Sequence, residues 1–140
     1  GAAKLLPVIT ARTIVDKLNL DRLRANMIEA AEQCGRTALP ELAEPVSLAK
    51  LLKNWPADRA LLFADEDGGA RLTANLCRAP AAILIGPEGG FTPAERDTIR
   101  AHPQTVAITL GPRILRAETA AIAALAVWQA LAQNPYTRKD

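Results

Sequence analysis

Two spacings of apolar residues recur along the chain and predict an α/β fold. Short apolar runs bounded by Gly, Pro or polar turns predict buried strands at residues 4–9, 60–64, 81–85 and 105–110. Apolar residues three and four positions apart predict helices at residues 20–34, 48–54, 93–101 and about 118–133. Residues 70–79 are ambiguous and could form a short helix. This order predicts one α/β domain with a mostly parallel sheet.

Polar residues and glycines mark where several of these helices begin and end. Asn19 or Asp21 can cap the helix over 20–34, and Gly35 suits its carboxyl end. Thr92-Pro93-Ala94-Glu95 has the residues of a capping box with Pro in the first helical position. These signals fix the ends of the predicted elements on either side of the loops discussed next.

Two glycine-containing loops each follow a predicted strand. Gly86-Pro87-Glu88-Gly89-Gly90 follows the strand over 81–85, and Gly111–Arg116 follows the strand over 105–110. Ligands of open α/β sheets bind at the carboxyl ends of strands. We therefore expect both loops to face one pocket that binds a small molecule.

The composition is that of an ordinary globular domain. The 140 residues are 49% hydrophobic and 23% charged, with a formal net charge of +2, which does not by itself demand a nucleic-acid partner. No apolar run approaches the ~20 residues that span a membrane. Without a leader-like segment, a cytoplasmic location is the expectation.

Other potentially reactive side chains have simpler interpretations. Cys34 and Cys77 show no metal-binding spacing and are interpreted as buried thiols. His102 lies where a helix should end and is expected at the surface or as a cap. The acidic segment 65–69 is expected to be a solvated turn, because it lacks the calcium-loop pattern. No metal site is predicted.

Familiar catalytic motifs are absent from the sequence. It contains no phosphate-loop motif, no dinucleotide-binding glycine motif and no nucleophile elbow. With one His, triad hydrolysis and zinc chemistry are disfavoured. The two glycine loops, Glu88, Glu118 and a few Arg side chains suit a cofactor that carries its own reactivity.

Four segments resemble conserved blocks of one family. Ile85-Gly-Pro-Glu-Gly-Gly-Phe-Thr-Pro-Ala-Glu95 and Leu110-Gly-Pro-Arg-Ile-Leu-Arg-Ala-Glu-Thr-Ala120 resemble the paired signature of the RsmE family, ribosomal RNA small subunit methyltransferases of the SPOUT superfamily. Ile28-Glu-Ala-Ala-Glu-Gln-Cys-Gly-Arg36 and Pro7-Val-Ile-Thr-Ala-Arg12 resemble two further blocks. The resemblance covers essentially the whole chain.

The resemblance implies an S-adenosylmethionine-dependent enzyme that methylates N3 of a uridine in 16S ribosomal RNA, within the assembled small subunit. It also implies a SPOUT-type trefoil knot, which connection rules alone would not predict, and a homodimer. The family's N-terminal PUA-like domain has no counterpart here, and Gly1 falls after the family's first strand and helix. The resemblance thus implies a catalytic domain that is truncated at its N-terminus and could be inactive alone.

The resemblance also assigns candidate site residues. Arg116 and Arg12 are candidates to stabilise the uracil anion, and Glu118 is a candidate base, although it could instead cap the last helix. The cofactor is expected to contact three segments of the chain. The residues are Leu62, Phe63, Ala64, Gly86, Pro87, Glu88, Gly89, Leu110, Gly111, Ile114, Leu115, Arg116, Ala117, Thr119 and Ala120.

Two other functions stay open at this point. The chain could be a non-catalytic RNA-binding module that keeps the fold, although such a module would not need both glycine loops. It could also be a flavodoxin-like domain that binds a phosphate or nucleotide at helix N-termini. RNA affinity without cofactor affinity would favour the first alternative, and competition by phosphate or a nucleotide would favour the second.

Overall fold

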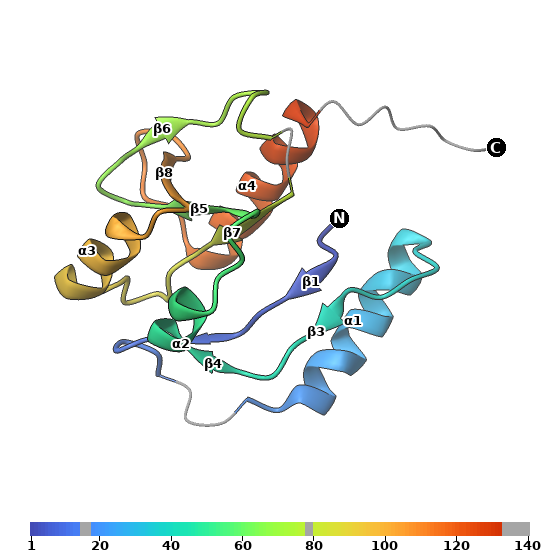
Figure 1. Ribbon diagram of the computed structural model, residues 1–140. Helices are drawn as coiled ribbons and strands as arrows, with labels where there is room; N and C mark the ends of the chain where they lie inside the picture. Colours follow the sequence, from blue (N-terminus) through green and yellow to red (C-terminus); the bar gives the residue numbers. More distant parts are fainter. Residues whose placement is uncertain (15–17, 78–79, 133–140) are drawn as a thin grey trace.

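A four-stranded parallel sheet forms the centre of the molecule (Figure 1). The computed structural model describes residues 1–14, 18–77 and 80–132. The strands are β5 (Ala60–Ala64), β6 (Ala70–Arg71), β7 (Ala81–Leu84) and β8 (Thr105–Thr109), in the spatial order β6-β8-β5-β7. Neighbouring strands run parallel, with Leu62 beside both Ile83 and Val106. The predicted α/β class with a mostly parallel sheet is confirmed.

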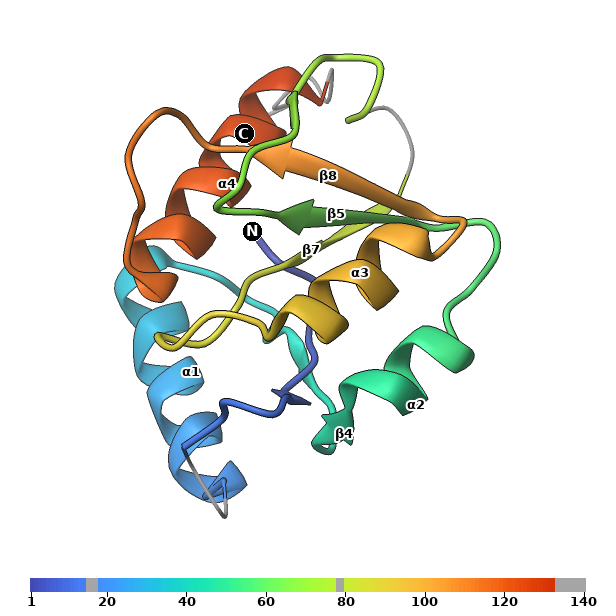
Figure 2. The same cartoon turned by 90° about the vertical axis from the view of Figure 1, so that its left-hand side faces the viewer.

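Helices cover both faces of this sheet. The helices α2 (Leu48–Lys53) and α3 (Pro93–Ala101) lie on one side, and α4 (Ala117–Leu131) lies on the other (Figure 2). Side chains alternate between the two faces along a strand. Both faces of β5 are consequently buried, as its apolar run predicts.

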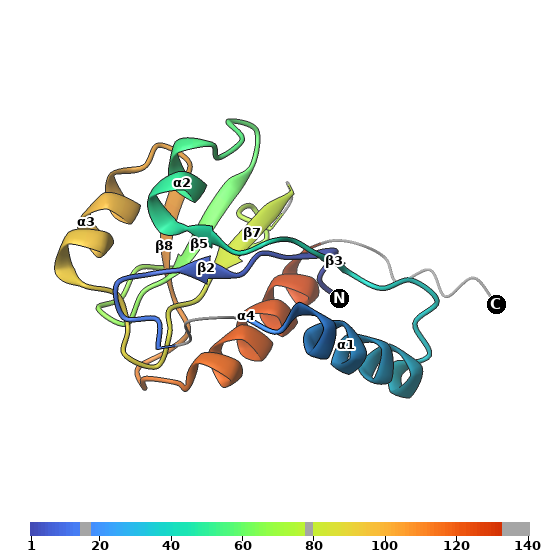
Figure 3. The same cartoon turned by 90° about the horizontal axis from the view of Figure 1, so that it is seen from below.

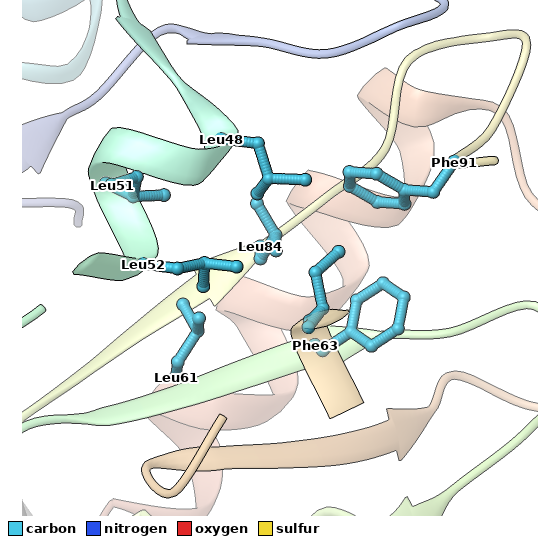
Figure 4. Packing of buried hydrophobic residues seen from close by; sticks show 8 residues of the cluster. Leu48, Leu51, Leu52, Leu61, Phe63, Leu84 and Phe91 are labelled. Atoms are coloured by element: carbon cyan, nitrogen blue, oxygen red, sulfur yellow. The ribbon is translucent and has the colours of Figure 1, made fainter. Parts of the chain in front are cut away.

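The main hydrophobic core lies between the sheet and the helices α2 and α3. Leu61 of β5 points toward the leucines of α2 (Leu48, Leu51 and Leu52), and the Phe63 ring points toward Phe91, as Figure 4 shows. Leu84, Phe91 and Ile99 complete this cluster. Phe91 meets Phe63 edge to face at 5.4 Å between ring centroids, so the core reaches the end of the first glycine loop.

The N-terminal part forms two short parallel strand pairs beside the main sheet. β1 (Lys4–Leu5) pairs with β3 (Glu41–Leu42), and β2 (Val8–Ile9) pairs with β4 (Val46–Ser47). Helix α1 (Leu20–Cys34) lies below these strands in Figure 3. The predicted strand over 4–9 is interrupted at Pro7, which lacks a backbone N–H to pair.

The predicted helix ends are confirmed by specific hydrogen bonds. The Asn19 side chain accepts from the Arg22 N–H at 2.9 Å, and Gly35 ends α1 with φ +65°. Thr92 and Glu95 form the reciprocal capping box of α3. The side chain of His102 approaches the Leu52 carbonyl at 3.1 Å, beyond the end of α3, which agrees with the expected capping role.

Two predictions about local structure are wrong at one residue each, Cys34 and Asp65, and the ambiguous stretch 70–79 is settled in part. Cys34 is exposed, because it occupies the last turn of α1, whereas Cys77 is buried as predicted. The stretch 70–79 begins with the strand β6 rather than a helix, and its last two residues lie outside the described ranges. The acidic turn is not uniformly solvated, since Asp65 is only 5% exposed.

The last helix ends slightly earlier than predicted. Helix α4 ends at Leu131, and its C-cap Ala132 has an extended backbone, whereas the predicted end is at about residue 133. Within the described ranges, no helix combines the length and apolar character needed to cross a membrane.

Candidate functional site

A cavity of about 570 Å³ opens at the carboxyl ends of the three strands β5, β7 and β8. Parallel strands place these ends at one edge of the sheet. The residues that follow each strand therefore converge, and they form the cavity wall. The lining segments are Phe63–Glu66, Ile85–Glu88 with Gly90 and Phe91, and Leu110–Glu118 with Ala120. The two glycine loops thus face one pocket.

Most of the predicted cofactor and catalytic residues line this cavity. Phe63 and Ala64 come from the end of β5, and Gly86, Pro87 and Glu88 come from the first loop. The second loop and the start of α4 supply the remaining residues, which are Leu110, Gly111, Ile114, Leu115, Arg116, Ala117, Glu118 and Ala120.

Four predicted site residues do not line the cavity. Leu62 is fully buried in the middle of β5, and its side chain lies on the opposite sheet face from Leu61 and Phe63. Thr119 is exposed in the first turn of α4. Gly89 lies in the first loop but outside the lining, and Arg12 contacts the back of that loop.

The structure adds a polar group that sequence reasoning missed. Asp65, Glu66 and Arg96 line the cavity beside the first loop. The two acidic residues directly follow the central strand β5. Their position at the carboxyl end of a parallel strand could have marked them as site residues. Their composition instead suggested an ordinary solvated turn, and Arg96 gave no signal because it is an isolated cation on a helix.

Asp65 is held by two arginines of α3. It accepts from Arg100 Nε at 2.7 Å and also pairs with Arg96. Burial raises the pKa of Asp65, but the hydrogen bonds from Arg96, the Asp67 backbone and Arg100 together outweigh it and hold the pKa below its ordinary value. Arg96 also contacts Glu66 and Asp67. The loop after β5 is therefore fixed to α3 at the cavity edge.

The first glycine loop is fixed from the opposite side by the turn after β2. Arg12 Nη1 donates to the Gly89 carbonyl at 2.7 Å, and the Ala11 N–H donates to Glu95 Oε1 at 2.7 Å. Burial raises the pKa of Glu95, but hydrogen bonds from the Ala11 and Thr92 backbone and the Arg12 charge lower it below its ordinary value. Glu95 is therefore a carboxylate at neutral pH.

The second loop presents charged side chains that none of the described residues pairs. Arg113, Arg116 and Glu118 are exposed and line the cavity. Within residues 1–14, 18–77 and 80–132, no ion pair or side-chain hydrogen bond involves any of the three. A cation at the α4 N-terminus is also opposed by the helix dipole. Arg116 is thus available to a bound anion.

The described side chains offer no metal centre. No group of three or more His, Cys, Asp or Glu side chains within the described ranges is arranged to hold a metal ion.

The fold and the site define an RNA methyltransferase domain. The family model of that description matches residues 1–129, so the chain belongs to this family. Among curated proteins, it is 35% identical over 131 residues to ribosomal RNA small subunit methyltransferase E of Rickettsia conorii, covering 90% of this chain and 53% of that protein. This likeness confirms the RsmE resemblance of the two C-terminal motifs.

Two solved structures share the fold. Ribosomal RNA small subunit methyltransferase E from Neisseria gonorrhoeae, bound to S-adenosylmethionine, is 32% identical with a TM-score of 0.86, covering 94% of this chain and 56% of that one. Lpg2936 of Legionella pneumophila, in complex with the same cofactor, is 34% identical with a TM-score of 0.70, covering 93% and 56%. The chain spans about half the length of the relatives it matches.

Proposed function

We propose that the cavity binds S-adenosylmethionine and that the domain transfers its methyl group to N3 of a uridine in 16S ribosomal RNA. The observation that carries this proposal is the convergence of both family motifs on one cavity at the ends of β5, β7 and β8. The cofactor-bound structures of two relatives with the same fold support it.

The lining residues fit this cofactor in size and chemistry. A cavity of about 570 Å³ lies in the range of ~300–1,000 Å³ of small-molecule sites. Leu110, Ile114 and Leu115 offer an apolar wall that suits the adenine ring. Glu66 and Glu88 line the same cavity and supply negative charge for the cationic sulfonium and ammonium groups. The loop backbones leave N–H and C=O groups for its polar edges.

The protein's task is to align and polarise the acceptor. The sulfonium of S-adenosylmethionine makes the methyl group electrophilic, so the residues mainly position an in-line transfer. Uracil N3 carries a proton and becomes nucleophilic when that proton leaves. The guanidinium of Arg116 can stabilise the resulting negative charge on O2 or O4, because nothing in the described residues pairs it.

Glu118 is the candidate to accept the N3 proton. It lines the cavity one helical position beyond Ala117, near the proposed anion site of Arg116. A carboxylate in the first turn of a helix is also favoured by the helix dipole. Glu118 could act as a base or only interact with the helix dipole. Replacing Glu118 tells these roles apart, because only loss of a base changes the pH dependence of methyl transfer.

The uridine must be unpaired or leave its stack, because N3 lies on the Watson–Crick edge.

We place the substrate within the small ribosomal subunit and the enzyme in the cytoplasm as a homodimer. The small-residue surface of α4, with Ile122 70% exposed, supports a subunit contact.

Transfer to isolated small subunits tests this proposal. The full-length protein that contains this domain is incubated with radiolabelled S-adenosylmethionine and unmethylated subunits, and nucleosides are identified by mass spectrometry. Label in 3-methyluridine from 16S RNA is expected. Label in another nucleoside, or cofactor binding without any transfer to RNA, would contradict it.

A further inference from the structure

The turn that follows β2 is an ordered unit rather than a loose connection. Thr10 N donates to the Thr13 hydroxyl at 2.9 Å, and Thr13 N donates to the Thr10 carbonyl at 3.2 Å. The two hydroxyl oxygens also lie 3.0 Å apart, at hydrogen-bond distance. The positions of Ala11 and Arg12, between them, are therefore fixed by local bonds.

Two contacts join this turn to the carboxyl end of the first glycine loop and to the start of α3, the helix that follows it. Arg12 Nη1 reaches the Gly89 carbonyl at 2.7 Å, while the Ala11 N–H reaches Glu95 Oε1 at 2.7 Å. The second carboxylate oxygen of Glu95 accepts from the Thr92 N–H at 2.9 Å. The turn consequently holds the carboxyl end of the loop through Arg12 and the cap of the following helix through Ala11.

Gly89 also leaves room for the Arg12 side chain. Its φ is not in the positive range that favours glycine, unlike that of Gly90 at +66°. A Cβ built on Gly89 would lie 3.4 Å from Arg12 Cβ and 3.6 Å from Arg12 Cδ, already in van der Waals contact. A larger side chain would displace Arg12, so this glycine keeps the contact rather than providing an unusual backbone angle.

We infer that Arg12 is a positioning residue that sets the shape of the first glycine loop through Gly89, rather than a residue that touches the reacting base. Its guanidinium is engaged on the outer side of the loop whose Gly86, Pro87 and Glu88 line the cavity. A charged donor on a backbone carbonyl makes a stronger hydrogen bond than a neutral one. The inference rests on the proposed function, because the loop matters through the cofactor it holds.

The test measures cofactor affinity without RNA. S-adenosylhomocysteine is titrated calorimetrically into the wild type and into Arg12→Ala, Arg12→Lys and Arg36→Ala. Loss of one charged hydrogen bond is expected to weaken binding by about tenfold in Arg12→Ala. Arg12→Lys should recover part of this loss, because Lys keeps one charged donor. Arg36 donates to the Ala2 carbonyl at 3.4 Å, away from the cavity, so Arg36→Ala should match the wild type.

The outcomes separate the possible roles of Arg12. A folded Arg12→Ala that binds S-adenosylhomocysteine as the wild type does would overturn the inference. Unchanged affinity with a lower kcat on RNA would assign Arg12 to catalysis instead. If the wild type itself fails to bind, the proposed function fails. Circular dichroism and the urea unfolding midpoint of each variant show that a weaker affinity is not loss of the fold.

Discussion

Arg116 is the cation whose charge matters most directly to the proposed chemistry. It lies at the N-cap of α4 without a capping side-chain bond, and it lines the cavity. We expect Arg116→Ala in the full-length enzyme to lower kcat about 10²-fold or more, as for loss of one anion-stabilising donor. Measured by methyl transfer to small subunits, near-normal turnover would remove Arg116 from the mechanism. Arg113→Ala, in the same loop, should have a smaller effect.

Asp65 is the residue whose removal should cost most stability at the cavity edge. Its side chain is fully buried and pairs with both Arg96 and Arg100. Asp65→Asn leaves two cations without their shared carboxylate, so we expect the free energy of unfolding to fall by about 2–4 kcal/mol. Urea unfolding measures this change.

Asp67→Asn is the matched control, because Asp67 contacts the same Arg96 but its side chain is 66% exposed. An exposed pair is worth about 1 kcal/mol or less. Equal losses in the two variants would show that burial does not determine the contribution of Asp65.

At the scale of the element, the conformation of the first glycine loop depends on the close packing of Gly86 against Phe91 of the core. A Cβ on Gly86 would lie 2.9 Å from Phe91 Cε2, and Phe91 is packed on Phe63. Gly86→Ala should therefore displace Phe91, lower the free energy of unfolding by about 1–3 kcal/mol and weaken S-adenosylhomocysteine binding.

Gly89→Ala provides the comparison within the same loop, since its Cβ would meet Arg12 only at ordinary contact distance. We expect it to change the free energy of unfolding by less than about 1 kcal/mol. Equal free energies of unfolding for Gly86→Ala and Gly89→Ala would show that the close packing of Phe91 on the loop does not contribute to stability.

The longer elements could be predicted because each carries its own signals. The helix over 20–34 has an apolar face, the Asn19 cap and Gly35, and it is observed as Leu20–Cys34. The strands β3, β4 and β6 have two residues each, too few for an alternating pattern. Their pairing comes from distant partners, such as Leu42 with Leu5, and this information is not local in sequence.

The candidate site was predictable to the level of its loops but not of all its contacts. Strand order in a parallel sheet brought Gly86 and Gly111 to one edge, as the motifs suggested. The pairing of Asp65 with Arg96 joins residues 31 positions apart, and no sequence pattern marks it. The SPOUT trefoil knot and the homodimer stay predictions from the family resemblance.

At the scale of the whole molecule, the free energy of unfolding should decrease at acid pH. The pKa values of Asp65 and Glu95 are lowered in the folded state, so the unfolded chain takes up protons first as the pH falls. Their stabilisation is complete above about pH 5 and is lost as the pH falls through their folded pKa values. Urea unfolding between pH 7 and pH 3 should therefore show a declining free energy of unfolding below about pH 5.

The Asp65→Asn variant identifies the source of this dependence, because it removes one of the two groups. Its free energy of unfolding should decline less steeply with acid than that of the wild type. Parallel pH profiles for both proteins would show that other carboxylates cause the decline.

The measurement that tests the central claim most directly is calorimetric titration of S-adenosylhomocysteine into this 140-residue chain. The convergence of Gly86–Glu88 and Leu110–Glu118 on one cavity predicts saturable binding of one ligand per chain, which Gly89→Val should weaken by displacing Arg12. Binding should also raise the free energy of unfolding, by about 2.7 kcal/mol at a hundredfold excess over Kd. A folded chain that neither binds the ligand nor is stabilised by it would contradict a cofactor site complete within these residues.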